Sequence, residues 1–153
     1  MAANRIRVAK DKAELVKSLV ASKDTTGPFQ TYVEVMVFAA ALGVKYKKRV
    51  SLDVISKDLS PLRQDYFTSS FTLLINLLAI TETEHIKIIG DDNVADEQRI
   101  HIFEEYANGG LEILQNELRG AVDYSERLLL ILNSERFQDY GEEEEFDLSK
   151  FLS

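Results

Sequence analysis

The stretch that decides the fold is TYVEVMVFAAALGVKYKKRV, residues 31–50. Between residues 32 and 42 it is apolar on nearly every side of a helix, with Glu34 as the exception. A helix that is apolar all round must be buried, so we expect it either at the centre of a core or in an oligomer interface. Thr31 can cap its start. Gly43 predicts its end, because glycine accepts the left-handed conformation of the residue that follows a helix.

A run of cations follows this helix: Lys45, Lys47, Lys48 and Arg49, with Tyr46 between them. Cations at a helix C-terminus favour the macrodipole by roughly 0.3–1 kcal/mol each, but that effect fades within a turn. We therefore predict that the run contacts nucleic-acid phosphates, where each neutralised phosphate releases counterions. Tyr46 would stack on a base if the target were single-stranded. The alternative is that the run only keeps the end of a buried helix solvated.

The N-terminal segment RIRVAKDK, residues 5–12, alternates between polar and apolar residues. Ile6 and Val8 share one side and Arg5 and Arg7 the other, which is typical of a short half-buried strand. An amphipathic helix is predicted next, so the order is strand, amphipathic helix, buried helix. This order resembles the ribbon-helix-helix fold, whose two-chain ribbon can enter the DNA major groove. By that resemblance, Arg5 and Arg7 would point toward base edges.

Charge is distributed unevenly along the chain, which has a net charge of -8. Residues 1–50 contain ten Lys and Arg against four Asp and Glu, whereas residues 51–153 contain eight against twenty-two. A two-signed chain suggests a basic end that meets a polyanion and an acidic end that meets something else. We expect a basic strand-helix-helix unit over 1–50, an acidic helical unit over 51–138 packed on it as one domain, and an acidic tail over 139–153.

The acidic part is predicted to be helical, which makes the whole chain mainly α. Helix starts are expected at Ser60-Pro61, Asn93 and Asp123, and Asn108-Gly109-Gly110 is expected to end the helix that begins at Asn93. Segment 85–103 fits either a helix or a strand hairpin, because HIKII and RIHIF both alternate.

Catalytic signatures are missing from the sequence. It has no cysteine, no phosphate-binding glycine loop and no nucleophile elbow. His85 and His101 are its two histidines, and a metal pair on one helix face is conceivable, but the zinc-protease pattern is missing. Glu104 and Glu105 are adjacent and are expected to serve solvation. We predict a non-enzymatic protein without metal or cofactor.

The expected location is the cytoplasm, because cysteine is missing and no signal peptide is evident. The most apolar run, FTLLINLLAI at residues 71–80, is half of the roughly 20 residues that a membrane helix needs. No membrane partner is expected.

The tail YGEEEEFDLSKFLS differs in kind from the rest. Four glutamates repel one another and favour exposure, yet apolar residues follow. Such a pattern can dock into a groove on a partner with a basic rim. The predicted partner-binding residues are Phe146, Leu148, Phe151 and Leu152. Packing of the tail on its own domain or on a symmetry mate is the alternative.

Two longer stretches carry a resemblance. IFEEYANGGLEILQNEL (102–118) and TGPFQTYVEVMVFAAALGVKYKKRV (26–50) resemble the DNA phosphorothioation (Dnd) system-associated protein 4 family. The resemblance implies an accessory of a bacterial system in which other proteins place sulfur on the DNA backbone or restrict unmodified DNA. It supplies no catalytic residues.

We therefore predict a non-enzymatic accessory of a modification or defence system, and a homo-oligomer. Its basic first third would contact the DNA backbone, and its acidic part would contact other proteins of the system. The alternative is a pure protein-protein adaptor without DNA contact.

Overall fold

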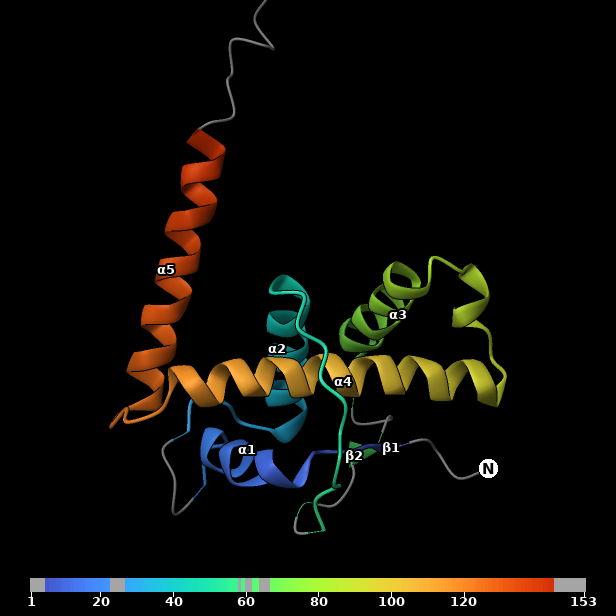
Figure 1. The fold of residues 1–153 in the computed structure, drawn as a ribbon, viewed down its shortest axis with the longest axis horizontal. Coiled ribbons are helices and arrows are strands. Elements are labelled where there is room, and N and C mark those ends of the chain that lie inside the picture. Colours follow the sequence, from blue (N-terminus) through green and yellow to red (C-terminus); the bar gives the residue numbers. More distant parts are fainter. Residues whose placement is uncertain (1–4, 23–26, 58, 60–61, 64–66, 145–153) are drawn as a thin grey trace, which may run out of the picture. The chain divides into compact units, whose positions relative to one another are not determined.

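The structure is a computed structural model that describes residues 5–22, 27–57, 59, 62–63 and 67–144. The chain forms two compact units, Met1–Glu117 and Leu118–Ser153. In the first unit the longest helix is α4 (Asn93–Glu117), and α1 (Ala13–Leu19), α2 (Tyr32–Lys45) and α3 (Ser69–Thr83) all pack against it (Figure 1). The core of this unit therefore lies around α4, and the predicted mainly α fold is confirmed.

α2 and α4 approach each other so closely that their backbones touch. A Cβ added at Gly110 would lie 1.7 Å from the carbonyl oxygen of Ala39, and one at Gly43 would lie 2.1 Å from the carbonyl oxygen of Tyr106. Only glycine permits such an approach. Ala39 and Met36 of α2 are almost wholly buried there. Of the two places expected for the apolar helix, the structure puts it in the core of a single chain.

Two predicted helix ends are wrong for the same reason. α2 continues through Gly43 to Lys45, and α4 runs unbroken through Asn108, Gly109 and Gly110 to Glu117. These glycines keep helical backbone and serve close packing, so they do not terminate the helices. The predicted starts at Thr31 and Asn93 are confirmed, since the hydroxyl of Thr31 accepts the backbone N–H of Glu34 at 3.2 Å.

The N-terminal segment keeps the predicted alternation, with Ile6 and Val8 buried and Arg5 and Arg7 exposed. Strand β1 (Arg5–Ile6) pairs antiparallel with β2 (Leu62–Arg63), and Ile6 lies opposite Leu62. A 3-10 helix, η1 (Lys10–Lys12), leads into α1. The order strand, helix, buried helix is thus present. The strand's partner, however, belongs to the same chain, where a ribbon-helix-helix protein would use a second copy.

α3 begins after Thr68, whose hydroxyl accepts the N–H of Phe71 at 3.3 Å. It buries Ile75 and Leu78. The 3-10 helix η3 (Ile86–Ile89) then joins α3 to α4, so segment 85–103 is mostly helical. The helix start predicted at Ser60-Pro61 lies outside the described residues.

The second unit holds α5 (Tyr124–Glu144). The carboxylate of Asp123 accepts the N–H of Glu126 at 3.2 Å, which confirms the predicted start. From this start α5 runs to Glu144. Among the residues that the structure describes, no helix has the length and apolar character needed to cross a membrane.

The approach of α2 to α4 predicts a steric response to one methyl group. Gly110→Ala should lower the free energy of unfolding by about 2–3 kcal/mol. The new Cβ would meet the main-chain carbonyl of Ala39, which cannot move aside as a flexible side chain can. Urea denaturation followed by circular dichroism measures this loss. Gly90→Ala is the matched control. Its added Cβ would lie 3.2 Å from the nearest atom, so it should cost less stability than Gly110→Ala. Equal stabilities of the two variants would contradict the packing.

Candidate functional site

Three of the predicted nucleic-acid residues, Arg7, Lys48 and Arg49, meet carboxylates of α4. Glu104 and Glu105 of α4 are only 2% and 7% exposed. The expectation that these two glutamates serve solvation is therefore wrong. A buried carboxylate is stable only when it is paired or hydrogen-bonded, and each of these two receives an arginine from a different segment of the chain. We call Arg7, Arg49, Glu82, Glu104 and Glu105 the arginine-glutamate network.

Arg7 binds Glu104 with two bonds. Its Nε donates to Oε2 and its Nη2 donates to Oε1, each at 3.1 Å. The backbone N–H of Arg7 donates to the same carboxylate. The hydrogen bond to Glu104, and then its charge, raise the pKa of Arg7 above the usual arginine value. This two-bond geometry ties the N-terminal segment to α4 and engages the Nε–Nη2 edge of the guanidinium.

Arg49 lies between two carboxylates. Its Nε donates to Glu105 Oε1 at 2.6 Å, and its Nη1 donates to Glu82 Oε1 at 2.7 Å. Ser51 Oγ also donates to Glu105, at 3.1 Å, while the hydroxyl of Tyr106 donates to Glu82 at 2.6 Å. Arg49 thereby joins the end of α2 to both α3 and α4.

The pKa values in this group follow from these bonds. The hydrogen bond from Tyr106 and the bond and charge of Arg49 lower the pKa of Glu82, against a smaller opposing effect of burial. The same bond raises the pKa of Tyr106. Burial lowers the pKa of Arg49, but its hydrogen bonds and its attraction to Glu105 and Glu82 outweigh that effect, so the pKa is raised. All three shifts favour the ion-paired form that the structure contains.

The rest of the basic run forms the turn after α2. The ammonium of Lys48 lies 3.7 Å from Glu112. Tyr46 and Lys47 are exposed, and Lys47 adopts a left-handed backbone with a φ of 53°. Lys45 is exposed at the last position of α2. The structure therefore separates the predicted set: Arg7, Lys48 and Arg49 face carboxylates, whereas Tyr46 and Lys47 project from the turn.

Gly109 positions this segment. A Cβ added there would lie 2.0 Å from the carbonyl oxygen of Lys48, so only glycine lets the chain after α2 run against α4. The amide of Asn108 then donates to the carbonyls of Val50 and Ser51 at 3.3 and 3.2 Å. This contact brings Arg49 within reach of Glu105.

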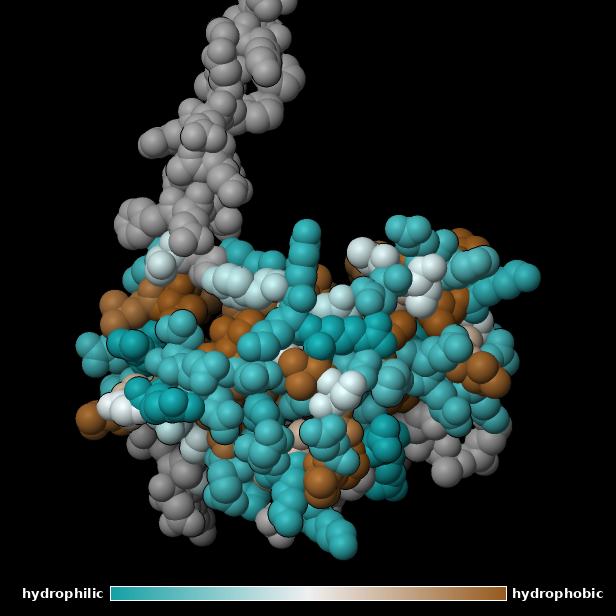
Figure 2. Space-filling model, viewed as in Figure 1, coloured by the Kyte–Doolittle hydropathy of each residue, from teal (hydrophilic) through white to brown (hydrophobic). Residues whose placement is uncertain are grey.

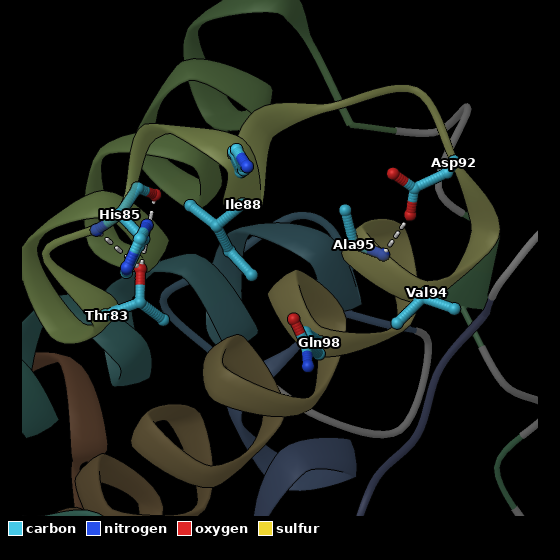
Figure 3. A pocket seen from close by; sticks show the side chains of 8 residues that line it. Thr83, His85, Ile88, Asp92, Val94, Ala95 and Gln98 are labelled. Carbon is cyan, nitrogen blue, oxygen red and sulfur yellow. Dashed lines mark hydrogen bonds between the residues drawn. The ribbon is translucent and has the colours of Figure 1, made fainter.

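The two histidines have different neighbours. His101 Nε2 is 3.4 Å from Glu105. His85 lines a cavity of about 360 Å³ between η3 and the start of α4, together with Thr83, Asp92 and Gln98 (Figure 3). Asp92 is already engaged there, because it accepts the N–H of Ala95 at 2.7 Å. Within the described part of the chain, no three His, Cys, Asp or Glu residues are grouped so as to hold a metal ion.

Sequence reasoning missed the glutamates of the network. Glu82 and Glu105 stand 23 positions apart, and no local pattern links them to Arg49. One signal was available in the sequence. Glu104 and Glu105 directly follow the apolar residues Ile102 and Phe103, which suggests that part of this helix is buried. The predicted partner-binding residues Phe146, Leu148, Phe151 and Leu152 lie outside the described residues.

The fold and the network define a small helical protein whose basic segment is held on an acidic helix. The chain belongs to the DNA sulphur modification system-associated protein 4 family, whose model matches residues 5–151. The predicted family is thereby confirmed, and with it an accessory role in such a system. Neither a curated protein nor a solved structure matches the chain.

The lowered pKa of Glu82 predicts a stability that depends on pH. A carboxylate whose pKa is lower in the folded state stabilises that state above its ordinary value of 4.5, and this stabilisation is lost as the pH falls through the folded value. The urea midpoint should therefore fall on acidification below about pH 5, and Glu82→Gln should make that fall shallower. The exposed neighbour Glu84 supplies the control, Glu84→Gln, which should keep the wild-type profile. Identical profiles for both variants would refute a role for Glu82.

Proposed function

We propose that this protein is a non-catalytic accessory of a DNA sulphur modification system that works by docking other proteins of that system through α5. The observation that carries the proposal is the exposure of Leu129, Leu130 and Leu132, which are 60, 55 and 47% exposed. They belong to five consecutive apolar residues, 128–132. Leu129 and Leu132 stand three positions apart and share one face of the helix, as the anchor residues do in a helix that binds in the groove of another protein.

The charge of α5 indicates what kind of groove it fits. Four acidic residues lie between Asp139 and Glu144, in the last turns of the helix, and no basic residue accompanies them. Acidic residues at a helix C-terminus oppose the macrodipole, so a basic surface beside them would remove an unfavourable interaction. The partner is accordingly a protein with an apolar groove and a basic rim.

The docking proposal predicts that changes in α5 weaken binding to one protein of the system. The double variant Leu129→Glu, Leu132→Glu should weaken binding to one purified protein of the system at least about 30-fold, as for hot-spot residues of an interface. Titration calorimetry against each system protein in turn measures this. Leu73→Glu, on α3, is the matched control and should bind as the wild type does. A melting temperature lowered by many degrees in the double variant would instead assign these leucines to the fold.

Contact with the DNA backbone is a second proposal, favoured by the projection of Tyr46 and Lys47 from the turn after α2. Arg5 and Lys45 are exposed as well. The ion pairs of Arg7, Lys48 and Arg49 weaken what these three side chains can offer to a phosphate, because the charge of each is already partly balanced by a carboxylate. A DNA contact would therefore depend most on Lys47 among the predicted residues.

The DNA proposal predicts a change in salt dependence. Lys47→Ala should weaken duplex binding for every sequence and reduce the salt slope by about 0.9 for the lost phosphate contact. Fluorescence anisotropy at several salt concentrations measures both quantities. Lys87→Ala, in η3, is the matched control. If the wild type shows no salt-dependent binding, the protein is an adaptor without DNA contact.

A further inference from the structure

A cavity of about 640 Å³ lies in the first unit, where η1, the segment after α2 and α4 meet. Small-molecule sites have volumes of about 300–1,000 Å³, so this cavity is large enough to hold a ligand. Figure 1 shows the segment after α2 crossing α4 on its way to β2, and Figure 2 shows that the surface of the first unit is mostly hydrophilic in the same view. None of the five residues of the arginine-glutamate network lines the cavity. The proposed function makes no use of it.

Hydrogen bonds join the three walls of the cavity to one another. The backbone N–H of Lys10 donates to the carbonyl of Val54 at 2.7 Å and connects η1 to the segment after α2. The amide of Asn108 connects that segment to α4 through two of its backbone carbonyls. The amide of Gln115 donates to the backbone carbonyl of Asp11 at 3.4 Å and connects η1 to α4. The walls are therefore in place before a ligand arrives, which lowers the entropic cost of binding.

Two buried polar side chains line the cavity. Asn108 is 4% exposed, and its Oδ1 has no hydrogen-bond partner in the part of the chain that the structure describes. Lys12 is 3% exposed, and its ammonium donates to the carboxylate of Asp11 at 2.8 Å. An ammonium has three donors, so Lys12 can bind a ligand and keep Asp11. A buried oxygen without a donor is unfavourable, and a ligand that supplies an N–H group would remove that penalty.

The walls of the cavity differ in charge. η1 contributes Lys10 and Lys12 against Asp11, so its wall is basic. Asp53 and Glu112 lie on the other two walls, and no Lys or Arg accompanies them among the described residues that line those walls. A simple anion would be attracted to the first wall and repelled by the others, and a simple cation would experience the reverse.

We propose that the cavity binds a small zwitterion, which carries a carboxylate at one end and an ammonium at the other. The carboxylate accepts hydrogen bonds from the ammonium of Lys12. The ammonium of the ligand donates to Oδ1 of Asn108 and faces Asp53, while Glu112 is already partly balanced by Lys48 at 3.7 Å. A ligand of this kind meets both signs of charge and gives the buried oxygen its donor.

The rest of the lining narrows the class of ligand. Val50 and Val54 are apolar and favour an apolar side chain on the zwitterion. No aromatic residue is among the described residues that line the cavity, so a nucleobase would find no stacking partner there. A free amino acid and a dipeptide share the required chemistry, and the two are distinguished by experiment.

Thermal unfolding of the full chain with L-leucine or L-leucyl-L-leucine tests the proposal. At about 10 mM, at least one of these probes should raise the melting temperature by about 3 °C. N-acetyl-L-leucine lacks the ammonium and L-leucinamide lacks the carboxylate, and calorimetry should show each binding at least about tenfold more weakly than L-leucine. The zwitterion that binds more tightly identifies the source of the ligand.

Two variants test the walls separately. Lys12→Met removes the ammonium but keeps the length of the side chain, and it should weaken binding of the zwitterion at least about tenfold. Lys17→Met, on α1 and outside the lining, is the matched control and should bind as the wild type does. Asp53 is exposed, so Asp53→Asn should fold normally and weaken binding about threefold. If Lys12→Met does not fold, Asp53→Asn decides.

The position of the ligand has an independent readout. The side-chain amide resonances of Asn108 should shift when the zwitterion is added to the wild type, and resonances that stay in place would show that it binds elsewhere. Three further results overturn the proposal: neither probe raises the melting temperature, N-acetyl-L-leucine binds as tightly as L-leucine, or folded Lys12→Met binds as the wild type does. The second of these would indicate a site for simple anions.

Discussion

The contact of two backbones at Gly109 and Gly110 is the constraint on which the first unit depends. Ala39 of α2 and Lys48 after it both press their carbonyl oxygens against α4, at positions where a single methyl group would not fit. Because the chain leaves α2 in this position, Arg49 arrives beside Glu105 and Val50 donates to the carbonyl of Glu105 at 3.0 Å. The polar network is thus a consequence of the packing of small residues, and its distances follow from that packing.

The network in turn explains how two adjacent carboxylates are tolerated inside a helix. Neighbouring residues on a helix point about 100° apart, so Glu104 and Glu105 look toward different segments. Glu104 meets Arg7 from the N-terminal segment, and Glu105 meets Arg49 from the segment after α2. Each carboxylate has its own cation, and removal of either arginine would leave a buried charge unpaired. The arginines therefore fix two chain segments on different sides of α4.

The parts of the fold that the sequence predicts are those decided by neighbours in the chain. The alternation from Arg5 to Val8, the cap at Thr31 and the burial of the apolar helix all follow from local pattern. Gly43 and Gly109 were misread, because glycine indicates a helix end locally but here makes room for main chain far away in the sequence. The partners of Arg49 were not predictable either, since Glu82 and Glu105 reach it only after α3 and α4 have packed. The cations of the site were visible in the sequence, and the carboxylates that hold them were not.

The dependence of α2 on α4 also has a consequence for synthesis on the ribosome. α2 is complete long before the segment with Gly109 and Gly110 has been made, and the side of α2 that packs on α4 has no cover until then. The nascent chain must therefore carry an exposed apolar helix through the translation of all of α3 and most of α4. Long-range contacts of this kind delay cooperative folding and leave intermediates prone to aggregation. During that interval α2 is a substrate for chaperones that bind apolar helices. The interval ends when the C-terminal half of α4 leaves the exit tunnel and can cover α2.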